Sequence, residues 1–168
     1  MVKKTTTAGD SKAAAIAKVF DLIQENSVEF VDLRFTDPRG KWHHTTQYVT
    51  TIEEDTFTEG FMFDGSSIAG WKAINESDMV LLPDPETAVM DPFTARPQLI
   101  LFCDIIEPST GQPYNRDPRS TAKLAEQYLK SSGLGDTAFF GPEAEFFIFD
   151  NVRFGTGPNF GKYQLDSI

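Results

Sequence analysis

The chain has 168 residues, 40% hydrophobic and 12% aromatic, a composition that supports a folded core and argues against disorder. Its 15 basic and 25 acidic residues give a net charge of -10, which disfavours nucleic acid and anionic membranes as partners because both attract basic proteins. No apolar run is long enough to span a membrane and no secretory signal is recognisable, so the sequence predicts a cytoplasmic protein.

The first predicted element is a helix at Ser11–Asn26, because apolar residues recur there at positions i, i+3, i+4 and i+7. Two alternating segments follow, at residues 31–35 and 41–49. The Asp-Pro-Arg-Gly sequence between them favours a turn, so the pair predicts a β-hairpin. His43 and His44 are neighbours on the second strand and point to opposite faces, which favours surface or structural roles over a shared metal ion.

Beyond the hairpin, Thr51–Glu54 has the spacing of a capping box and predicts the start of a short helix. Apolar runs at residues 79–82, 87–90 and 99–106 predict strands separated by proline-rich connections. The last run contains Cys103, the single cysteine, which excludes an intrachain disulfide and is expected to pack as a small apolar side chain. One helix with several strands favours the α+β fold class.

A stretch rich in proline, glycine and polar residues, 107–118, predicts a linker, and we place a domain boundary there, between domains of residues 1–113 and 114–168. Asp117 is the expected N-cap of a second helix that ends at Gly133. Residues 137–141 and 143–150 are then predicted to be strands. The glycines of the segment 155–161 have the wrong spacing for a dinucleotide-binding loop, so no nucleotide-binding motif is predicted.

Two acids, Glu143 and Glu145, lie in the sequence GPEAEFFIFD between a Gly-Pro pair and four large apolar residues. On a strand they share one face, about 6.6 Å apart, and at an effective dielectric constant near 20 they repel by on the order of 2.5 kcal/mol. A partly buried pair therefore needs a nearby positive charge, and oxygen ligands suit Mg²⁺ or Mn²⁺. The alternatives are a solvated strand face and pairing with Arg or Lys.

The second informative stretch is FMFDGSSIAGWKAINESDM, residues 61–79. Its Asp64-Gly65-Ser66-Ser67 sequence predicts an Asx-type turn, and large apolar residues surround the turn. An exposed loop with so many apolar side chains usually packs against another surface. The alternative is a loop folded over its own domain.

In this order and spacing, the 61–79 stretch, YNRDPRSTA and GPEAEFFIFD resemble the N-terminal third of a bacterial type I glutamine synthetase. The resemblance runs from about Ser11 to the end of the chain. It implies a small β-grasp-like N-terminal domain followed by the start of an α/β catalytic domain with a mostly antiparallel sheet. It also implies an enzyme that makes glutamine from glutamate, ammonium and ATP through γ-glutamyl phosphate, as part of nitrogen assimilation.

The resemblance assigns roles to four residues. It implies that Glu143 and Glu145 bind two different metal ions, Mg²⁺ or Mn²⁺, that neutralise the transferring phosphoryl group. It implies that Asp64 assists the binding and deprotonation of ammonium, while Ser67 has a lesser role near the substrate. The loop of Asp64 would reach the active site of a neighbouring subunit, with Trp71 at the subunit interface, in a homo-oligomer of two stacked hexameric rings.

Two other functions are compatible with parts of the sequence. A stand-alone β-grasp domain would act as a regulatory or interaction module that binds a partner protein. A carboxylate-bridged metal hydrolase would need a cluster of histidines or acids that the sequence lacks. If the chain is the first third of a synthetase, the other metal ligands and the ATP-binding residues lie outside it, and the 168 residues alone are expected to be inactive.

Overall fold

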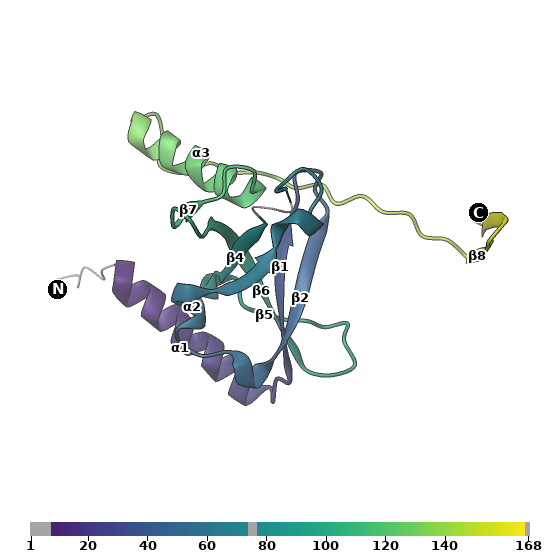
Figure 1. Cartoon of the computed structure of the whole chain (residues 1–168), viewed down its shortest axis with the longest axis horizontal. Helices are drawn as coiled ribbons and strands as arrows, with labels where there is room; N and C mark the ends of the chain where they lie inside the picture. Colours follow the sequence, from purple (N-terminus) through teal and green to yellow (C-terminus); the bar gives the residue numbers. More distant parts are fainter. Residues whose placement is uncertain (1–7, 74–76, 167–168) are drawn as a thin grey trace. The chain divides into compact units, whose positions relative to one another are not determined.

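The computed structural model describes residues 8–73 and 77–166, which form two units, Met1–Asp136 and Thr137–Ile168 (Figure 1). The first unit contains a mixed sheet with the strand order β2-β1-β6-β4-β3. β1 and β6 are parallel, and the other neighbouring strands are antiparallel. The bounds of these strands, in chain order, are β1 (Phe30–Thr36), β2 (Trp42–Tyr48), β3 (Phe61–Asp64), β4 (Asp78–Pro83) and β6 (Gln98–Glu107). This architecture confirms the predicted α+β class.

The predicted first helix is confirmed as α1 (Ala8–Glu25), which begins slightly before the expected Ser11. Val19 is fully buried, and Ile16, Phe20 and Ile23 pack against the core from the same helix. The core continues through alternate residues of β1 and β6, including Leu33 of β1. Burying a leucine or isoleucine side chain in this way contributes about 1.5–3 kcal/mol, so the apolar stripe holds α1 against the sheet.

The predicted hairpin is also confirmed, because β1 and β2 pair in register from Thr36 opposite Trp42 to Phe30 opposite Tyr48. Its turn is organised by Asp37, whose Oδ1 accepts hydrogen bonds from the backbone N–H groups of Arg39 and Lys41 at 2.8 and 2.9 Å. A hydrogen bond from His43 is the main reason that the pKa of Asp37 lies below its ordinary value.

The two histidines have the structural roles that alternation along the strand predicts. His43 Nε2 lies 3.1 Å from Asp37 Oδ2, and His44 Nδ1 lies 2.7 Å from Oδ1 of Asp32, a different buried aspartate. The ring nitrogens of the two histidines are thus held by two different carboxylates.

Of the three apolar runs, 79–82 and 99–106 are confirmed as parts of β4 and β6. Cys103 is 1% exposed and packs in the core, where burial raises the pKa of its thiol. The run 87–90 is only partly a strand, since β5 is limited to Val89–Met90. Before it, Pro85–Thr87 form a 3-10 turn that Asp84 caps by accepting a hydrogen bond from Glu86 N–H.

The helix predicted to start at Thr51 is wrong. A 3-10 turn, η1 (Val49–Thr51), ends there, and the Thr51 hydroxyl donates to the carbonyl of Tyr48 instead of capping a following helix. The short helix in this region, α2, begins later and spans Thr56–Glu59. A threonine hydroxyl can serve either purpose, so the spacing of a capping box alone does not decide where a helix starts.

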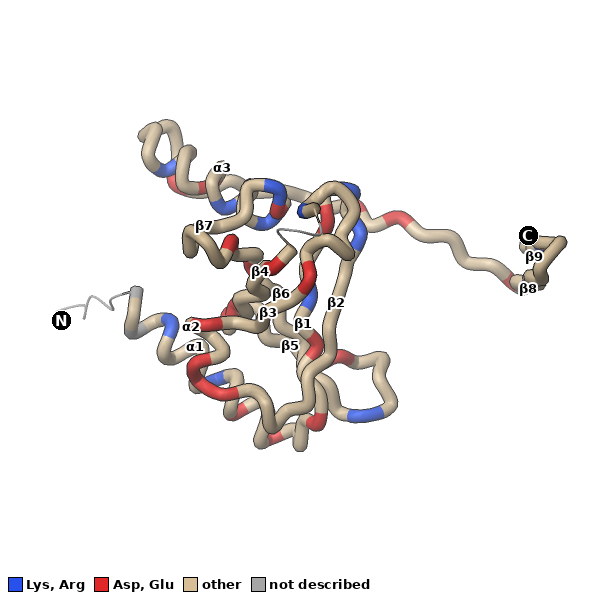
Figure 2. Tube along the Cα trace, in the orientation of Figure 1, with Lys and Arg blue, Asp and Glu red and all other residues tan. Residues whose placement is uncertain are grey.

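The second long helix, α3 (Pro118–Ser132), begins and ends as predicted, with Asp117 as N-cap and Gly133 in the left-handed conformation at φ +72°. Within the linker stretch, β7 (Gln112–Pro113) pairs with the end of β6. Basic residues of α3 lie over acidic residues of the sheet in the first unit (Figure 2), where Arg119 Nε contacts Asp104 Oδ1 at 2.8 Å. The domain boundary between residues 113 and 114 stays a prediction.

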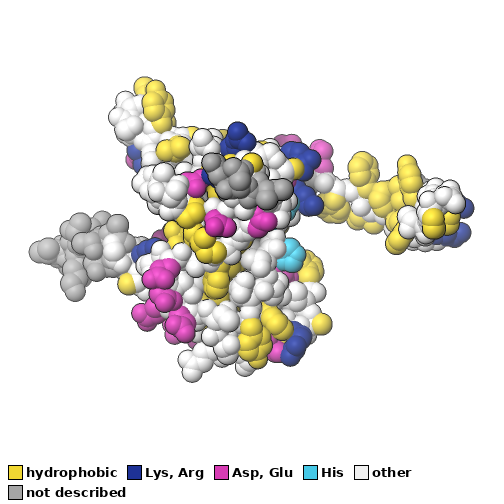
Figure 3. Space-filling model, in the orientation of Figure 1, with side chains coloured by type: hydrophobic (Ala, Val, Ile, Leu, Met, Phe, Trp, Pro, Cys, Tyr) yellow, Lys and Arg dark blue, Asp and Glu magenta, His cyan; other side chains and the backbone are white. Residues whose placement is uncertain are grey.

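The two strands predicted at residues 137–141 and 143–150 are wrong for this structure. Residues 137–149 have no helix or strand, and their side chains are largely exposed, with yellow apolar groups along the segment (Figure 3). A strand requires a neighbour that satisfies its backbone hydrogen bonds, and no described residue pairs with this segment. An antiparallel hairpin of β8 (Asn151–Gly157) and β9 (Phe160–Asp166), which the sequence analysis missed, completes the second unit.

No helix within residues 8–73 and 77–166 is long and apolar enough to cross a membrane. The sequence-based expectation about a secretory signal concerns the first residues, and residues 1–7 lie outside the described part of the chain.

Candidate functional site

Asp64 lies at the end of β3, where the chain leaves the sheet and enters the 3-10 turn η2 (Gly65–Ser67). β3 pairs with β4, and Asp64 is the register partner of Asp78 at the edge of this ladder. The strand fixes the backbone of Asp64, while its side chain is exposed to solvent. The carboxylate is therefore held at a defined place on the surface of the first unit.

The predicted Asx-type turn is confirmed. Asp64 Oδ1 accepts two hydrogen bonds from Ser66, one from the backbone N–H at 2.8 Å and one from the hydroxyl at 2.6 Å. These bonds, with a smaller contribution from Ser77, hold the pKa of the Asp64 carboxyl below its ordinary value. Asp64 is consequently an anion at neutral pH, with one oxygen committed to the turn.

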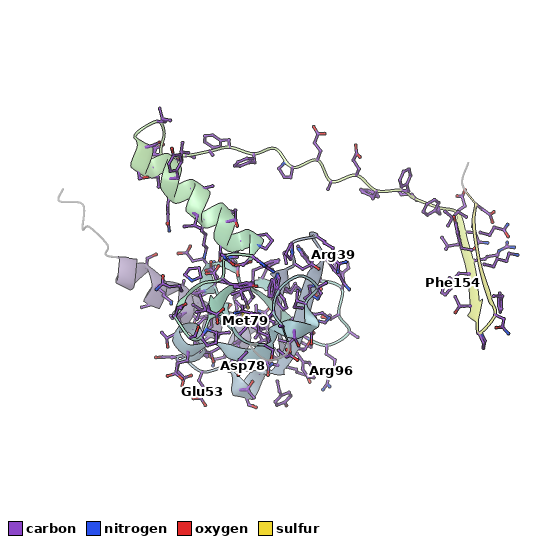
Figure 4. The ribbon with its side chains drawn as sticks, turned by 45° about the horizontal axis from the view of Figure 1, so that its top comes forward. Arg39, Glu53, Asp78, Met79, Arg96 and Phe154 are labelled. Carbon is purple, nitrogen blue, oxygen red and sulfur yellow. The ribbon has the colours of Figure 1, made fainter. Side chains whose placement is uncertain are left out.

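The turn packs closely on β4 through Gly65, whose N–H donates to the Ser77 carbonyl at 2.7 Å. A Cβ at Gly65 would lie 2.6 Å from Cγ of Met79 and 3.1 Å from the Ser77 oxygen. Met79, labelled inside the first unit in Figure 4, is fully buried and has little room to yield. The absence of a side chain at residue 65 is what allows Asp64 to lie so close to the sheet.

We therefore expect Gly65→Ala to destabilise the chain by about 1–3 kcal/mol, the usual effect of forcing extra atoms into a packed interior. Urea unfolding of the 168-residue chain followed by circular dichroism measures this. Gly161→Ala is the matched control, because a Cβ at Gly161 meets no atom within 4 Å. Equal unfolding midpoints for the two variants would contradict the close packing of the turn.

The expectation that Trp71 packs at a subunit interface is wrong for this structure, in which the loop folds over its own domain. Trp71 is 5% and Ile68 6% exposed, and both belong to the core of the first unit. The Trp71 ring contacts Phe35, Phe63 and Tyr114 with centroids 5.4–6.2 Å apart. The core of the loop's own domain therefore covers Trp71 and Ile68, and only Met62 keeps a large exposed apolar side chain in the stretch 61–73.

The far end of the loop is attached to the segment that precedes α3. The Tyr114 hydroxyl donates to the Trp71 carbonyl at 3.1 Å, and Arg116 Nη1 donates to the same carbonyl at 3.3 Å and to that of Gly70. The loop is thus fixed on both sides, by the turn at Asp64 and by these donors. Residues 74–76 of the 61–79 motif lie outside the described part of the chain.

Glu143 and Glu145 lie in the second unit, in the exposed segment that has no strand. The side-chain alternation expected for them therefore has no structural basis here. No group of three or more His, Cys, Asp or Glu residues suited to a metal ion occurs within residues 8–73 and 77–166. Two carboxylates are a donor set that fits Mg²⁺ or Mn²⁺, although such ions need further oxygen ligands.

Within the first unit, the structure brings Asp64 together with Ser66, whereas Glu143 and Glu145 belong to the second unit. Ser67 is exposed, and its side chain makes no hydrogen bond to the described residues. Sequence analysis named Ser67 and missed Ser66. The sequence does contain a signal for Ser66. An Asx turn directs the N–H group of the residue two positions after the aspartate toward its carboxylate, and here that residue is a serine.

Comparison with protein families gives two matches that follow one another along the chain. Residues 27–108 match the family described as "Glutamine synthetase, beta-Grasp domain". Residues 115–168 match the family described as "Glutamine synthetase, catalytic domain". The mixed sheet of the first unit is therefore a β-grasp sheet, as the resemblance implied.

The curated relatives of the chain are also glutamine synthetases. A glutamine synthetase from Azospirillum brasilense is 66% identical over 152 residues, which is 90% of this chain and 32% of the relative. One from Rhizobium meliloti is 62% identical over 150 residues, 89% of this chain and 32% of the relative. The chain spans about a third of the length of the curated relatives that it matches.

Among solved structures, a Plasmodium falciparum glutamine synthetase determined by cryo-electron microscopy matches 98% of this chain and 31% of its own, with a TM-score of 0.71. The sequence identity is 24%, so this likeness concerns the fold alone.

Proposed function

Since the chain belongs to the glutamine synthetase family, we propose that the complete protein is a glutamate–ammonia ligase that forms glutamine from glutamate, ammonium and ATP. ATP phosphorylates the glutamate side chain, and ammonia then displaces phosphate from the γ-glutamyl phosphate. The match of residues 115–168 to the catalytic domain disfavours a stand-alone regulatory module. The structural observation that carries the proposal is the anionic Asp64 carboxylate, held at the end of β3 in an exposed turn.

Asp64 is suited to attract ammonium and to accept its proton. Its charge favours a cation, and its pKa below the ordinary value keeps it ionised throughout the neutral range. Because Ser66 occupies Oδ1, the second oxygen remains available to a substrate N–H group. A positioned carboxylate that accepts a proton from a reacting nitrogen is general-base catalysis. Ser67, exposed beside it, would contact the substrate directly.

Glu143 and Glu145 would each contribute one oxygen ligand to a separate Mg²⁺ or Mn²⁺ ion. Such ions neutralise charge on a transferring phosphoryl group, which is their general role in phosphoryl transfer. The two acids are separated by one residue, so a strand conformation in the complete protein would direct both to one face. What supports this is the donor type and spacing together with the family membership.

We propose that the complete protein is a cytoplasmic homo-oligomer of two stacked hexameric rings, in which the Asp64 loop of one subunit reaches the active site of another. Two features support a role between subunits. The carboxylate is exposed on a surface turn, and Met62 of the preceding strand is 62% exposed. Burial of Trp71 in the core of its own domain anchors this loop to that domain.

The experiment that tests the proposal is the formation of glutamine by the complete protein with and without Asp64. We expect Asp64→Ala to raise the KM for ammonium by about tenfold or more, because a charge-assisted contact is worth about 1.5–3 kcal/mol. Glutamate-dependent phosphoryl transfer from ATP should persist in part. Steady-state kinetics against ammonium decide, and an unchanged ammonium dependence would count against the role of Asp64.

A further inference from the structure

The Asp64 carboxylate is held chiefly by Ser66, a residue without an assigned role, with a smaller contribution from Ser77. Ser66 donates to Asp64 Oδ1 twice, from its backbone N–H at 2.8 Å and from its hydroxyl at 2.6 Å. The hydroxyl bond is within the range typical of an O–H donor to a carboxylate, which is among the strong hydrogen bonds of proteins. Ser66 is half-buried, whereas Asp64 and Ser67 on either side of it are exposed.

We propose that Ser66 is a positioning residue of the ammonium site, whose hydroxyl fixes the rotation of the Asp64 carboxylate so that Oδ2 is presented to the incoming cation. The inference rests on the proposed role of Asp64. It differs from the role given to Ser67, which makes no hydrogen bond to the described residues and would have to act on substrate directly.

The geometry explains why a hydroxyl is useful at this position. An exposed aspartate side chain rotates freely between staggered conformations and loses entropy when it binds a ligand. The two donors of Ser66 both bind Oδ1 of Asp64, which fixes the direction in which Oδ2 points. The turn itself cannot shift easily, because Gly65 lies against buried Met79 and the Ser77 carbonyl.

Other charged and polar groups near Asp64 do not replace this contact. Asp78 is its register partner on β4, but an ionised carboxylate has no hydrogen to donate to Asp64. Ser77 makes a smaller contribution to the charged form than Ser66 does. Lys72 lies near Gly65, but its ammonium is paired with Glu107. Ser66 is therefore the residue on which the orientation of the carboxylate chiefly depends.

The first measurement uses the 168-residue chain and needs no activity. Titration of the Asp64 carboxyl carbon by NMR is compared for wild type, Ser66→Ala, Ser66→Thr and Ser67→Ala. We expect Ser66→Ala to raise the pKa of Asp64 toward its ordinary value, because it removes the hydroxyl donor and keeps the backbone donor. Ser66→Thr retains a hydroxyl and should restore the low pKa, and Ser67→Ala should leave it unchanged. Equal Asp64 titrations in wild type and Ser66→Ala would overturn the proposal.

The second measurement uses the complete protein. We expect Ser66→Ala to raise the KM for ammonium by about threefold to tenfold, the factor that corresponds to one hydrogen bond of ordinary strength. The KM values for glutamate and ATP should not change, and Ser66→Thr should recover the ammonium KM. A loss that affects all three substrates equally, or that threonine does not rescue, would show a merely structural role and overturn the proposal.

The two measurements also separate this inference from the proposed function. If Asp64→Ala does not alter the use of ammonium, the role of Asp64 itself fails. If Asp64→Ala weakens the use of ammonium and Ser66→Ala does not, only the positioning role of Ser66 is overturned. The titration reports on the contact between the two residues whatever reaction the protein catalyses.

Discussion

Replacing Glu143 or Glu145 by glutamine in the complete protein is expected to reduce the rate of glutamine formation by about 100-fold or more. Mutating a residue that only hydrogen-bonds to a metal ligand already reduces metal affinity or activity by roughly 10- to 100-fold. Glutamine keeps the size of the side chain and removes the negative charge that a divalent cation requires. Since both side chains are exposed in the described structure, neither substitution removes a packed contact. The protein should therefore fold normally and bind metal weakly.

The measurement pairs kcat for glutamine formation with Mn²⁺ affinity from isothermal titration calorimetry. The matched control is Glu126→Gln on α3, an exposed acid whose partner is Lys130 one helical turn away. This control should lose only a surface ion pair and keep full activity, since such pairs contribute about 0.3–0.5 kcal/mol on a helix. Wild-type activity with unchanged Mn²⁺ affinity in both the Glu143 and Glu145 variants would exclude the metal-binding role.

Much of the first unit could be predicted from local patterns. The apolar stripe of α1, the Asp-Pro-Arg-Gly turn of the hairpin and the Asp-Pro start of α3 are each determined by residues close together in sequence. In these cases the side chain that decides the structure, such as Asp37 or Asp117, hydrogen-bonds to backbone groups within four residues. Local chemistry and the overall fold agree there, which is the condition under which sequence patterns are reliable.

The errors have a different physical origin. Residues 137–149 have the composition of strands, yet a strand is stabilised by pairing with residues elsewhere, and the described chain provides none. The hairpin of β8 and β9 is not predicted, because glycine-rich segments occur in ligand-binding loops as well as in turns, although only Pro158 and Asn159 separate its strands. Long-range pairing is what a single sequence specifies least directly.

The candidate site shows the same difference between contacts that are local in sequence and contacts that are distant. The Asx turn at Asp64 was predicted, since it depends on neighbours in sequence, and its serine donor could have been identified in the same way. The burial of Trp71 could not be predicted in this way, because it depends on contacts with Phe35 and Tyr114, which are far away along the chain. An apolar loop residue has the same appearance in a sequence whether it packs on its own domain or on another subunit.

Loss of the Asp117 side chain is expected to destabilise the first unit strongly. Its carboxylate is fully buried and accepts hydrogen bonds from Arg119 N–H and Ser120 N–H, both at 3.1 Å, and from the Ser120 hydroxyl at 2.7 Å. Ile105 N–H on β6 is a further donor at 3.4 Å. The same side chain therefore caps α3 and connects it to the sheet, next to the ion pairs of Arg119 with Asp84 and Asp104.

We expect Asp117→Ala to lower the free energy of unfolding by about 2–4 kcal/mol, because it combines the loss of a helix cap with several buried donors left unpaired. Asp55→Ala is the matched control, since Asp55 precedes α2 in the N-cap position, is exposed and makes no side-chain capping bond. Asp117→Ser should recover part of the loss, as serine is also a good N-cap. Urea unfolding of the 168-residue chain, followed by circular dichroism, compares all three. If Asp117→Ala unfolds at the same urea concentration as Asp55→Ala, the buried carboxylate does not hold α3 to the sheet, and the ion pairs of Arg119 must be sufficient.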